Sequence, residues 1–348
     1  MAGIVGYGSY IPLYRIKTEE IARIWGKDPE DIRQGIGIDE ISVGGIDEDS
    51  VTIAVEAASN ALKRARIDKK KISAVYCGSE SKVYAVKPNA SIIGNALGIG
   101  EDYTAGDVEF ACKAGSASLQ ICTGLVSSGL AEYGLAIGSD TSQARPGGGI
   151  PEYIASSGGA AFIVGNRKEE IVAEIEHTLS VTSDIPDFWR RNMQPYPRHG
   201  ERFTGEKAYF KHTIEATKKL LDKINVNVSD VDHFVFHTPN IKFPMKIAKK
   251  LGVEKEKILA GLLVKKIGNA YSGSCMLGLS AVLDAAKPGE RIVMTSFGSG
   301  AGSDSFSFKV TGNIEEKRDS ALKTKDYIDK AQYIDYAIYC KYRGKILL

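Results

Sequence analysis

Cysteine is scarce in this sequence, and the positions of the cysteines exclude two kinds of protein. Five thiols are spread over 348 residues, and no two of them have the Cys-x-x-Cys spacing. Structural zinc sites use such closely spaced pairs, so we expect none. The odd number argues against a framework of disulfide bonds. We therefore expect reduced thiols in a cytoplasmic protein, with one cysteine free to react.

Long apolar runs and a strong net charge are also absent. No stretch approaches the roughly 20 apolar residues that a membrane helix needs. The first residues, MAGIVGYG, resemble a strand rather than a signal peptide. The net charge of +2 creates no field that would attract nucleic acid. We expect neither a membrane nor a nucleic acid as partner, and an anionic ligand would need a local basic patch.

Helix and strand patterns alternate along the sequence and predict an α/β fold. Residues 52–66 carry apolar side chains at helical spacing, and residues 72–78 form an apolar run of strand length. A strand, a sharp turn at Cys112, a helix of small residues and a second strand at 133–139 follow. A chain of 348 residues is long enough for two domains.

The second half of the chain repeats the order of the first. A shift of 159 positions aligns residues 213–237 with 54–78 without a gap, and a shift of 157 aligns 268–297 with 111–140. Similar composition could arise by chance, but a gapless register over a helix and a strand favours duplication. We therefore predict two similar α/β units whose two sheets enclose buried helices.

The duplication divides the chain into two predicted halves, 1–166 and 167–348. Two segments of the second half have no counterpart in the first. Residues 183–207 are rich in proline, arginine and aromatic residues, as long functional loops are. Residues 311–348 form a charged tail with four tyrosines at a spacing of three. The tail can pack on the body or present an interaction surface, and the sequence leaves both open.

Cys112 is the candidate nucleophile because it stands at a predicted strand-to-helix turn. A helix N-terminus presents free backbone N–H groups and the positive end of the helix dipole. Both favour the thiolate, so we expect the pKa of Cys112 to lie below the usual value of about 8.5. The alternative is that Cys112, like most free cysteines, is a small buried apolar side chain.

Three more candidates stand at positions that the duplication relates to one another. His237 ends a predicted strand, and Glu80 follows the equivalent strand of the first half. Asn269 occupies the turn that is equivalent to the turn of Cys112. A pseudo-twofold axis can therefore bring Cys112, His237 and Asn269 together, with Glu80 nearby. Taken alone, His237 also fits a structural histidine, and Glu80 also fits a solvated surface carboxylate.

Two further segments are candidates for ligand binding. Glycines within residues 296–306 allow backbone N–H groups to approach a substrate, although a plain tight turn is the alternative. The pattern lacks the Gly-Lys-Ser ending of a Walker A motif. Lys242, Lys246 and Lys249 share one face of the helix predicted after His237. Such a face is usually solvated, but beside a catalytic strand end it also suits phosphate groups.

Taken together, these motifs resemble those of the thiolase superfamily. The segments GSESKVYAVKP around Glu80, EFACKAGSAS around Cys112 and RHGERFTGEKAYFKH at 198–212 are similar to segments of hydroxymethylglutaryl-CoA (HMG-CoA) synthases. The segment at 198–212 is especially similar to the archaeal members. The resemblance covers essentially the whole chain and implies a thiolase-like α/β fold, internally duplicated, with five layers in the order α-β-α-β-α.

The resemblance also implies a reaction and its residues. Acetyl-CoA and acetoacetyl-CoA would condense with water to HMG-CoA, with coenzyme A thioesters as substrates and no further cofactor. Cys112 would accept the acetyl group, Glu80 would be the general acid and base, and His237 would orient and polarise the acetoacetyl group. The residues implied in substrate or CoA binding are Asp28, Pro29, Arg202, Thr204, Lys242, Lys246, Asn269 and Ser299, and no metal site is implied.

The sequence departs from the family pattern at one position and leaves two rival functions open. Ile154 stands where the family has a hydroxyl residue, so Ser156 or Ser157 would have to supply that hydrogen bond. The nearest rival is an initiating 3-ketoacyl-acyl-carrier-protein synthase, which needs no glutamate base, so Glu80 discriminates between the two. The second rival is a non-catalytic thiolase-like scaffold subunit.

The resemblance implies partners as well as substrates. Thiolase-fold enzymes normally form homodimers. The archaeal resemblance further implies a standing complex with acetoacetyl-CoA thiolase, bridged by a small zinc-containing OB-fold protein. Such a complex would pass acetoacetyl-CoA from one active site to the next.

Overall fold

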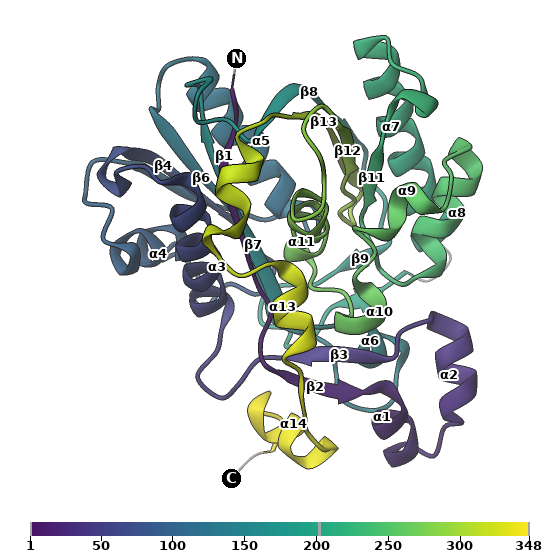
Figure 1. Cartoon of the computed structure of the whole chain (residues 1–348). Coiled ribbons are helices and arrows are strands. Elements are labelled where there is room, and N and C mark those ends of the chain that lie inside the picture. The colour runs from purple at the N-terminus through teal and green to yellow at the C-terminus, as the bar shows by residue number, and fades with distance from the viewer. Residues whose placement is uncertain (1, 201–202, 347–348) are drawn as a thin grey trace.

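A mixed β-sheet of nine strands organises the residues that the computed structural model describes, 2–200 and 203–346 (Figure 1). The strands of the first half are β1 (Gly3–Tyr10), β4 (Ile72–Gly78), β5 (Thr104–Val108), β6 (Tyr133–Asp140) and β7 (Gly158–Gly165). The strands of the second half are β8 (Ala173–Thr182), β11 (His233–Phe236), β12 (Arg291–Thr295) and β13 (Gly302–Val310). Their order across the sheet is β11-β12-β13-β8-β1-β7-β6-β4-β5.

The two halves of the sheet share one strand order, which confirms the predicted duplication. In the first half β4 runs parallel to β6, and β7 pairs antiparallel with both β6 and β1. In the second half β11 runs parallel to β12, and β13 pairs antiparallel with both β12 and β8. Among the described residues, only the first half adds a further strand, β5, beside β4. The division at residue 166 falls between β7 and β8 and stays a prediction.

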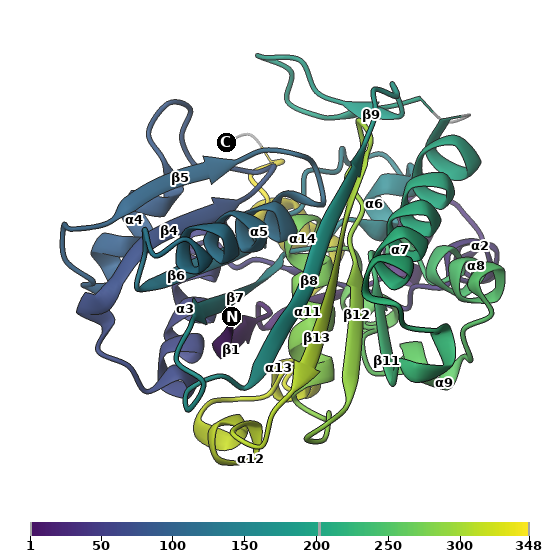
Figure 2. The same cartoon turned by 90° about the horizontal axis from the view of Figure 1, so that it is seen from above.

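Hydrogen bonds join the two halves into one sheet, where the sequence predicted two. The junction consists of Gly3 paired with Glu174 and Ile4 paired with Ala173, at one end of β1 and β8. These two strands occupy equivalent edges of the two halves, so their unpaired backbone groups meet there. Away from the junction the halves diverge, and Figure 2 shows helices lying between them.

Helices complete the five layers that the resemblance implied. Helices α5 (Ala114–Ser127) and α11 (Ser272–Leu283) lie between the halves, α3 (Ser50–Ala65) covers the outer face of the first half, and α7 (Lys211–Ile224) covers the outer face of the second. The central helices approach closely because they are built from small residues. A Cβ atom on Gly115 would lie 2.5 Å from the carbonyl oxygen of Ser272.

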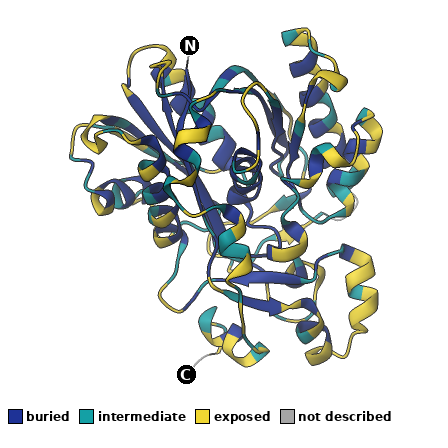
Figure 3. Cartoon of the chain, in the orientation of Figure 1, coloured by how far each residue is buried: buried dark blue, intermediate teal, exposed yellow. Residues whose placement is uncertain are grey.

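The main core fills the space around these central helices (Figure 3). Phe162 of β7, Met276 of α11 and Phe306 of β13 are completely buried within it. Close packing of this kind fixes the positions of the helix ends. The turns that precede α5 and α11 are therefore held by rigid elements on both sides.

Shorter elements surround the layers. Strands β2 (Tyr14–Lys17), β3 (Glu40–Val43) and β14 (Gln332–Tyr333) form a small sheet, and β9 (Phe188–Trp189) pairs with β10 (Arg198–His199). The other helices are α1 (Thr18–Ile24), α2 (Pro29–Ile36), α4 (Asn89–Leu97), α6 (Ile150–Ile154), the π-helix η3 (Thr204–Phe210), α8 (Lys242–Leu251), α9 (Glu256–Leu259), α10 (Val264–Ile267), α12 (Ile314–Lys317), α13 (Thr324–Asp329) and α14 (Tyr336–Tyr342). Short 3₁₀ turns occupy Lys69–Lys71, Val228–Asp230 and Arg318–Ser320. Across the described ranges, none of the helices combines the length and the apolar character that crossing a bilayer requires.

The C-terminal tail packs on the body of the protein. Strand β14 adds to the small sheet beside β2. In α13, the ring of Tyr327 lies edge-on to Tyr10 with 5.4 Å between ring centroids. In α14, the hydroxyl of Tyr336 accepts a hydrogen bond from the indole of Trp25 at 3.0 Å. Of the two possibilities that the sequence left open, the structure supports packing.

Candidate active site

Two equivalent turns bring Cys112 and Asn269 to the starts of the central helices. Cys112 follows Ala111, whose φ is 44°, and Asn269 follows Gly268, whose φ is 74°. A left-handed backbone is unfavourable for alanine, so packing must hold the first turn in place. The turn at Cys112 lies between the segment that continues from β5 and the N-terminus of α5, whereas the turn at Asn269 follows helix α10, where the duplication predicted a strand.

The structure places three of the predicted site residues in direct contact. The sulfur of Cys112 lies 3.2 Å from Oε1 of Glu80, which follows β4. Asn269 lies close enough to Cys112 to lower the pKa of its thiol, against the stronger effect of burial. Cys112 itself is buried, with 9% of the residue exposed. The pseudo-twofold argument is thus confirmed for these three side chains.

Asp140 holds the residues of this cluster together by hydrogen bonds, and the sequence analysis did not select it. Its Oδ1 atom accepts hydrogen bonds from the backbone N–H groups of Glu80 and Ser81, both at 2.9 Å, and from the hydroxyls of Ser79 and Ser81. Its Oδ2 atom accepts from the N–H of Ser272, the first residue of α11. One carboxylate therefore ties the end of β4 to the start of α11. An acidic residue at the end of a buried strand was the available signal.

Three further residues around Glu80 were also missed. The amide of Gln143 donates to Oε2 of Glu80 at 3.4 Å, and the backbone N–H of Gln143 donates to the Tyr271 hydroxyl at 3.1 Å. The guanidinium of Arg190 donates to the carbonyl oxygen of Glu80 at 3.3 Å. Arg190 belongs to the segment 183–207, which the sequence marked as functional without selecting this residue.

Burial and mutual proximity raise the pKa values of both Glu80 and Cys112. Burial, followed by the charge of Asp140, raises the pKa of Glu80 to about 8. Burial, followed by the charge of Glu80, raises the pKa of Cys112 well above its usual range. The lowering predicted from the helix N-terminus is therefore wrong, because desolvation and a carboxyl neighbour outweigh the helix dipole. Near neutral pH the pair holds its protons, and the thiol donates to the carboxyl group.

His237 lies at the end of β11, beside the first turn of α11. Its carbonyl oxygen accepts a hydrogen bond from the Tyr209 hydroxyl at 2.6 Å, and its neighbour Thr238 bonds to Ser274 at 3.0 Å. The imidazole is 1% exposed, and burial lowers its pKa to about 3. It is therefore neutral at physiological pH. Its Nδ1 atom is buried without a hydrogen-bond partner among the described residues.

The glycine segment at 296–302 packs against the nucleophile turn. A Cβ atom on Gly298 would lie 2.3 Å from the carbonyl oxygen of Phe110, two residues before Cys112. The neighbouring Ser299 hydrogen bonds to the side chain of Asp187. The segment therefore borders the site, as the sequence predicted, but the contact of Ser299 is made toward the 183–207 loop.

The structure brings some of the predicted CoA-binding residues together. Lys242 and Lys246 are exposed on α8, and Nζ of Lys246 lies 2.6 Å from Oε1 of Glu206. Glu206 belongs to the π-helix η3, which begins at Thr204. This contact places the segment of Thr204 beside α8. Arg202 lies outside the described residues.

Asp28 and Pro29 lie farther from α8. They begin α2, where Asp28 caps the helix by accepting the N–H of Glu30 at 2.8 Å. The opposite end of α2 meets the start of α8, where the N–H of Ile241 lies 3.4 Å from the carbonyl oxygen of Ile36. The eight residues of α2, about 12 Å of helix, therefore separate Asp28 from the residue that contacts Ile241 at the start of α8.

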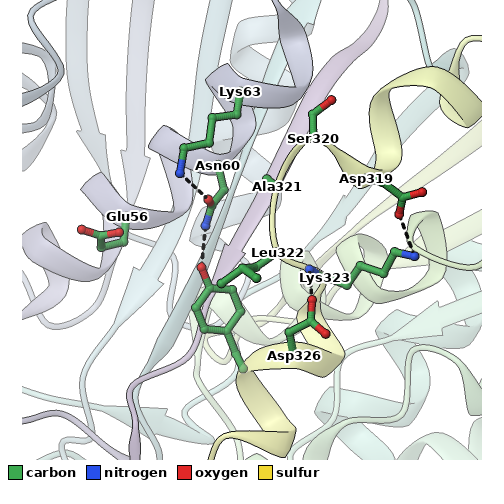
Figure 4. A pocket seen from close by; sticks show the side chains of 10 residues that line it. Glu56, Asn60, Lys63, Asp319, Ser320, Ala321, Leu322, Lys323 and Asp326 are labelled. Atoms are coloured by element: carbon green, nitrogen blue, oxygen red, sulfur yellow. Dashed lines mark hydrogen bonds and ion pairs between the residues drawn. The ribbon is translucent and has the colours of Figure 1, made fainter.

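Two cavities are present near the surface of the described chain. One of about 540 Å³ adjoins Lys242 and is lined by Ile241, Lys242, Met245, Lys255, Leu259, Leu262 and Lys265. Another of about 640 Å³ lies between α3 and the tail (Figure 4). The second contains none of the predicted site residues, and two of its charged groups, Asp319 and Lys323, pair with each other at 2.8 Å.

Known proteins resemble this chain over nearly its whole length. The family model for the C-terminal part of 3-oxoacyl-[acyl-carrier-protein] synthase III matches residues 221–310. Hydroxymethylglutaryl-CoA synthases of Archaeoglobus fulgidus and Methanocaldococcus jannaschii are each 58% identical over 346 residues, which is 99% of this chain and 99% of each relative.

Solved structures share the fold. A structure of HMG-CoA synthase complexed with CoA superimposes with a TM-score of 0.87 at 26% identity, covering 98% of this chain and 89% of that one. A 3-oxoacyl-(acyl carrier protein) synthase III from Pseudomonas aeruginosa gives a TM-score of 0.82 at 21% identity, covering 89% of this chain and 98% of that one. The duplicated five-layered fold and the cysteine at its helix-start turn define an acyl-transferring enzyme of the thiolase class. Within that class, the chain belongs to the hydroxymethylglutaryl-CoA synthase family.

Proposed function

We propose that this chain condenses acetyl-CoA with acetoacetyl-CoA and water to give (S)-3-hydroxy-3-methylglutaryl-CoA and CoA, an early step of the mevalonate pathway to isoprenoids. The contact of 3.2 Å between the Cys112 sulfur and the Glu80 carboxyl group carries the proposal. A nucleophile alone suffices to form an acyl-enzyme. Turning the acetyl methyl group into a carbon nucleophile also needs a base beside the acylated sulfur.

The first stage acetylates Cys112. Once Glu80 has released its own proton to solvent, the sulfur attacks the carbonyl carbon of acetyl-CoA while the thiol proton passes to the ionised carboxyl group of Glu80. The bond between that carbon and the sulfur of CoA then breaks, and the departing sulfur takes the proton from Glu80. A carboxyl group with a pKa of about 8 is a stronger base than an ordinary carboxylate, which suits it to accept these protons.

The second stage forms the carbon–carbon bond. Glu80 removes a proton from the methyl group of acetyl-Cys112, and the resulting carbon attacks the ketone carbon of acetoacetyl-CoA. The proton on Glu80 returns to the new alkoxide oxygen. His237, neutral because it is buried, donates a hydrogen bond to the ketone and polarises it. Water then cleaves the thioester at Cys112 and releases the product.

The remaining predicted residues hold the substrates in this scheme. Asn269 lies beside Cys112 and would contact the acetoacetyl thioester. Exposed lysines of α8 and the segment at Thr204 would bind CoA beside the cavity of about 540 Å³. Ser299 would line the pocket, and Asp28 and Pro29 would lie along the CoA path. Arg202 would join the CoA contacts.

The rival assignment is an initiating 3-ketoacyl-acyl-carrier-protein synthase, to which the family-model match at 221–310 and the fold both relate. Such an enzyme makes its carbanion by decarboxylation, so it does not need Glu80 as a base. The buried carboxyl group in contact with the nucleophile therefore favours HMG-CoA synthesis.

Intact-protein mass spectrometry with peptide mapping tests the proposal. Acetyl-CoA should add one acetyl group at Cys112, and acetoacetyl-CoA should discharge it as HMG-CoA. In Glu80→Ala the discharge should slow by about 10²–10⁴-fold, the usual contribution of a general acid or base. Discharge by a malonyl carrier protein alone would establish the rival, and absence of acetylation would establish the scaffold subunit.

We also propose the assembly and cellular setting that the family implies. The chain would act in the cytoplasm as a homodimer, in a standing complex with acetoacetyl-CoA thiolase and a small zinc-containing OB-fold protein. Direct transfer of acetoacetyl-CoA would draw the unfavourable thiolase step forward. Native purification from source cells followed by mass measurement tests this, and a monodisperse dimer without further subunits would contradict the complex.

A further inference from the structure

Arg343, which follows the C-terminal helix α14, binds the loop at 142–149, which borders the Cys112 site. Nη2 of Arg343 donates to the carbonyl oxygens of Ser142 and Ala144, at 2.7 and 3.0 Å. These two carbonyl groups flank Gln143 on both sides. The guanidinium also donates from Nη1 to the hydroxyl of Tyr339 at 2.6 Å, which fixes its direction.

Gln143 connects this contact to the reacting groups. Its side-chain amide donates to Oε2 of Glu80 at 3.4 Å, and its backbone N–H donates to the Tyr271 hydroxyl at 3.1 Å. Its neighbour Ala144 packs in one buried cluster with Cys112 and Tyr271. A single residue thus lies between the carbonyl groups that Arg343 binds and the carboxyl group of Glu80.

Tyr336, the first residue of α14, supports the other end of the loop through Glu152. Oε2 of the fully buried Glu152 accepts the N–H groups of Gly147 and Gly148, at 3.0 and 2.7 Å. Its Oε1 atom accepts the hydroxyl of Tyr336 at 2.8 Å. The loop between these two anchors contains three consecutive glycines, 147–149, which lose much conformational freedom on ordering. External contacts are needed to hold such a segment in one shape.

We propose that α14 is a positioning element for the acyl-transfer site, in which Arg343 and Tyr336 fix the loop at 142–149 so that Gln143 stays hydrogen bonded to Glu80. The proposal rests on the role of Glu80 proposed above. It assigns a function to the tyrosine-rich tail, which the reaction scheme leaves unused. Arg343 touches neither the nucleophile nor Glu80, so it acts through Gln143.

The groups around Glu80 determine what loss of this bond would do. Cys112, Asp140 and Tyr271 face its carboxyl group, and Arg190 is the nearby cation. The amide of Gln143 donates to the carboxyl oxygen and so lowers the pKa of Glu80, against the stronger effect of burial. A loop that moves away should therefore raise that pKa further and shift the pH profile of acyl transfer to higher pH.

Kinetics of an Arg343→Ala variant test the proposal, with Lys341→Ala as the matched control. Lys341 is exposed on the same helix. We expect Arg343→Ala to lower kcat by about tenfold or more, since small displacements of reacting groups have effects of this size. KM for acetyl-CoA should stay within about twofold, because the side chain of Arg343 bonds to Ser142, Ala144 and Tyr339, none of which is a predicted CoA residue. The midpoint of the pH profile should move upward, and Arg343→Lys should restore part of the rate. An unchanged kcat and pH profile in Arg343→Ala would overturn the proposal.

A double-mutant cycle with Gln143→Ala separates positioning from a general loss of structure. If Arg343 acts through Gln143, the double variant should be no slower than Gln143→Ala alone. Additive losses, or losses that follow the melting temperature, would instead show a merely structural role. If Arg343→Ala fails to fold, the milder Tyr336→Phe and Arg343→Lys variants provide the same comparison.

A readout that needs no HMG-CoA synthesis keeps this test apart from the proposed function. Alkylation of Cys112 by iodoacetamide, mapped by peptide mass across pH, reports on the thiol beside Glu80. A shifted alkylation profile in Arg343→Ala, in a chain that makes no HMG-CoA, would support the positioning role and reject the reaction. Normal HMG-CoA synthesis with an unshifted alkylation profile in Arg343→Ala would support the reaction and reject the positioning role.

Discussion

Glu80 and Cys112 are both ionisable and both buried, so each makes the other harder to ionise. The carboxyl group has a pKa of about 8, and the thiol pKa lies well above its usual range. The two protons therefore belong to the pair rather than to either residue alone. A resting site that holds both protons limits unwanted reactions of the thiol.

The raised pKa of Glu80 also affects stability. In the unfolded chain the carboxyl group has its ordinary pKa of 4.5, and in the folded chain the pKa is about 8. Between these values the folded state binds the proton more tightly, so this group lowers stability as pH rises from about 5 to 8. Glutamine cannot ionise, so Glu80→Gln should become more stable relative to the native chain across that window, by an amount on the order of a few kcal/mol.

Thermal unfolding at several pH values measures this difference. The exposed Glu254 provides the control, because Glu254→Gln makes the same substitution at a side chain that is not buried. A difference for Glu80→Gln that does not vary with pH would show that the carboxyl group is ionised in the folded protein at neutral pH.

Residue-level predictions could be made from the sequence where a local pattern carried the signal. Cys112 and Asn269 were found because each stands at a helix-start turn, and Glu80 because it follows a strand. The structural roles of Asp140 and Gln143 depend on partners about 60 residues away in the chain, which no local pattern shows. The predicted direction of the Cys112 pKa shift was wrong for a related reason, since burial is a property of the assembled fold and not of a local pattern.

At the scale of elements, the contact between α5 and α11 depends on glycine. A Cβ atom on Gly115 would meet the carbonyl oxygen of Ser272 at 2.5 Å and the Cα of Gly138 at 2.9 Å. Both are backbone atoms, so relief requires movement of a helix or a strand. We expect Gly115→Ala to destabilise the protein by about 1–3 kcal/mol through overpacking. Because α5 begins just after Cys112, the acetylation rate should also fall.

The same helix supplies a matched control. Gly124 is exposed, and a Cβ atom there would meet nothing within 4 Å. Gly124→Ala should therefore be neutral or stabilising by up to about 1 kcal/mol, from helix propensity alone. Urea unfolding of the two variants gives the comparison. Equal effects at both positions would contradict the close approach of α5 and α11.

Elements with strong periodicity were predicted well, and short irregular elements were not. The strand at 72–78 and the helix at 52–66 agree with β4 and α3 to within two residues. The π-helix η3 and the pair β9–β10 lie within or beside the segment treated as one loop. Such short elements are stabilised by tertiary contacts, as η3 is by the ion pairs of Glu206 with Lys246 and Lys250, so their sequences carry little periodic signal.

At the scale of the whole molecule, the duplicated halves are bridged by the C-terminal segment. The duplication could be inferred from the register of two alignments, because both copies keep the same order of elements. The path of the tail could not be inferred from the sequence, because it depends on contacts with residues in both halves. Arg64 of α3 is the clearest of these partners, since it is fully buried beneath the tail.

Arg64 binds the tail and both halves through one guanidinium group. Nε and Nη2 donate to tail carbonyl groups of Arg318, Ala321 and Leu322, at 2.9, 3.2 and 3.0 Å. Nη2 also forms an ion pair with Asp284, just after α11, at 3.2 Å. Arg64→Met would leave a buried carboxylate and four carbonyl groups, that of Tyr7 included, without this donor. Removing one member of a buried ion pair typically costs about 3–5 kcal/mol.

We therefore expect Arg64→Met to loosen the tail before the sheet unfolds. Limited proteolysis should cut between β13 and α14 faster than in the native chain, whereas Lys63→Met, one exposed position away on α3, should not change the rate. Because α14 is carried by this tail and holds the loop of Gln143, acyl transfer should decline together with the appearance of the cut. Rapid cutting with full acyl transfer would show that the active-site loop keeps its shape without the tail, and slow cutting would show that contacts other than Arg64 hold the tail in place.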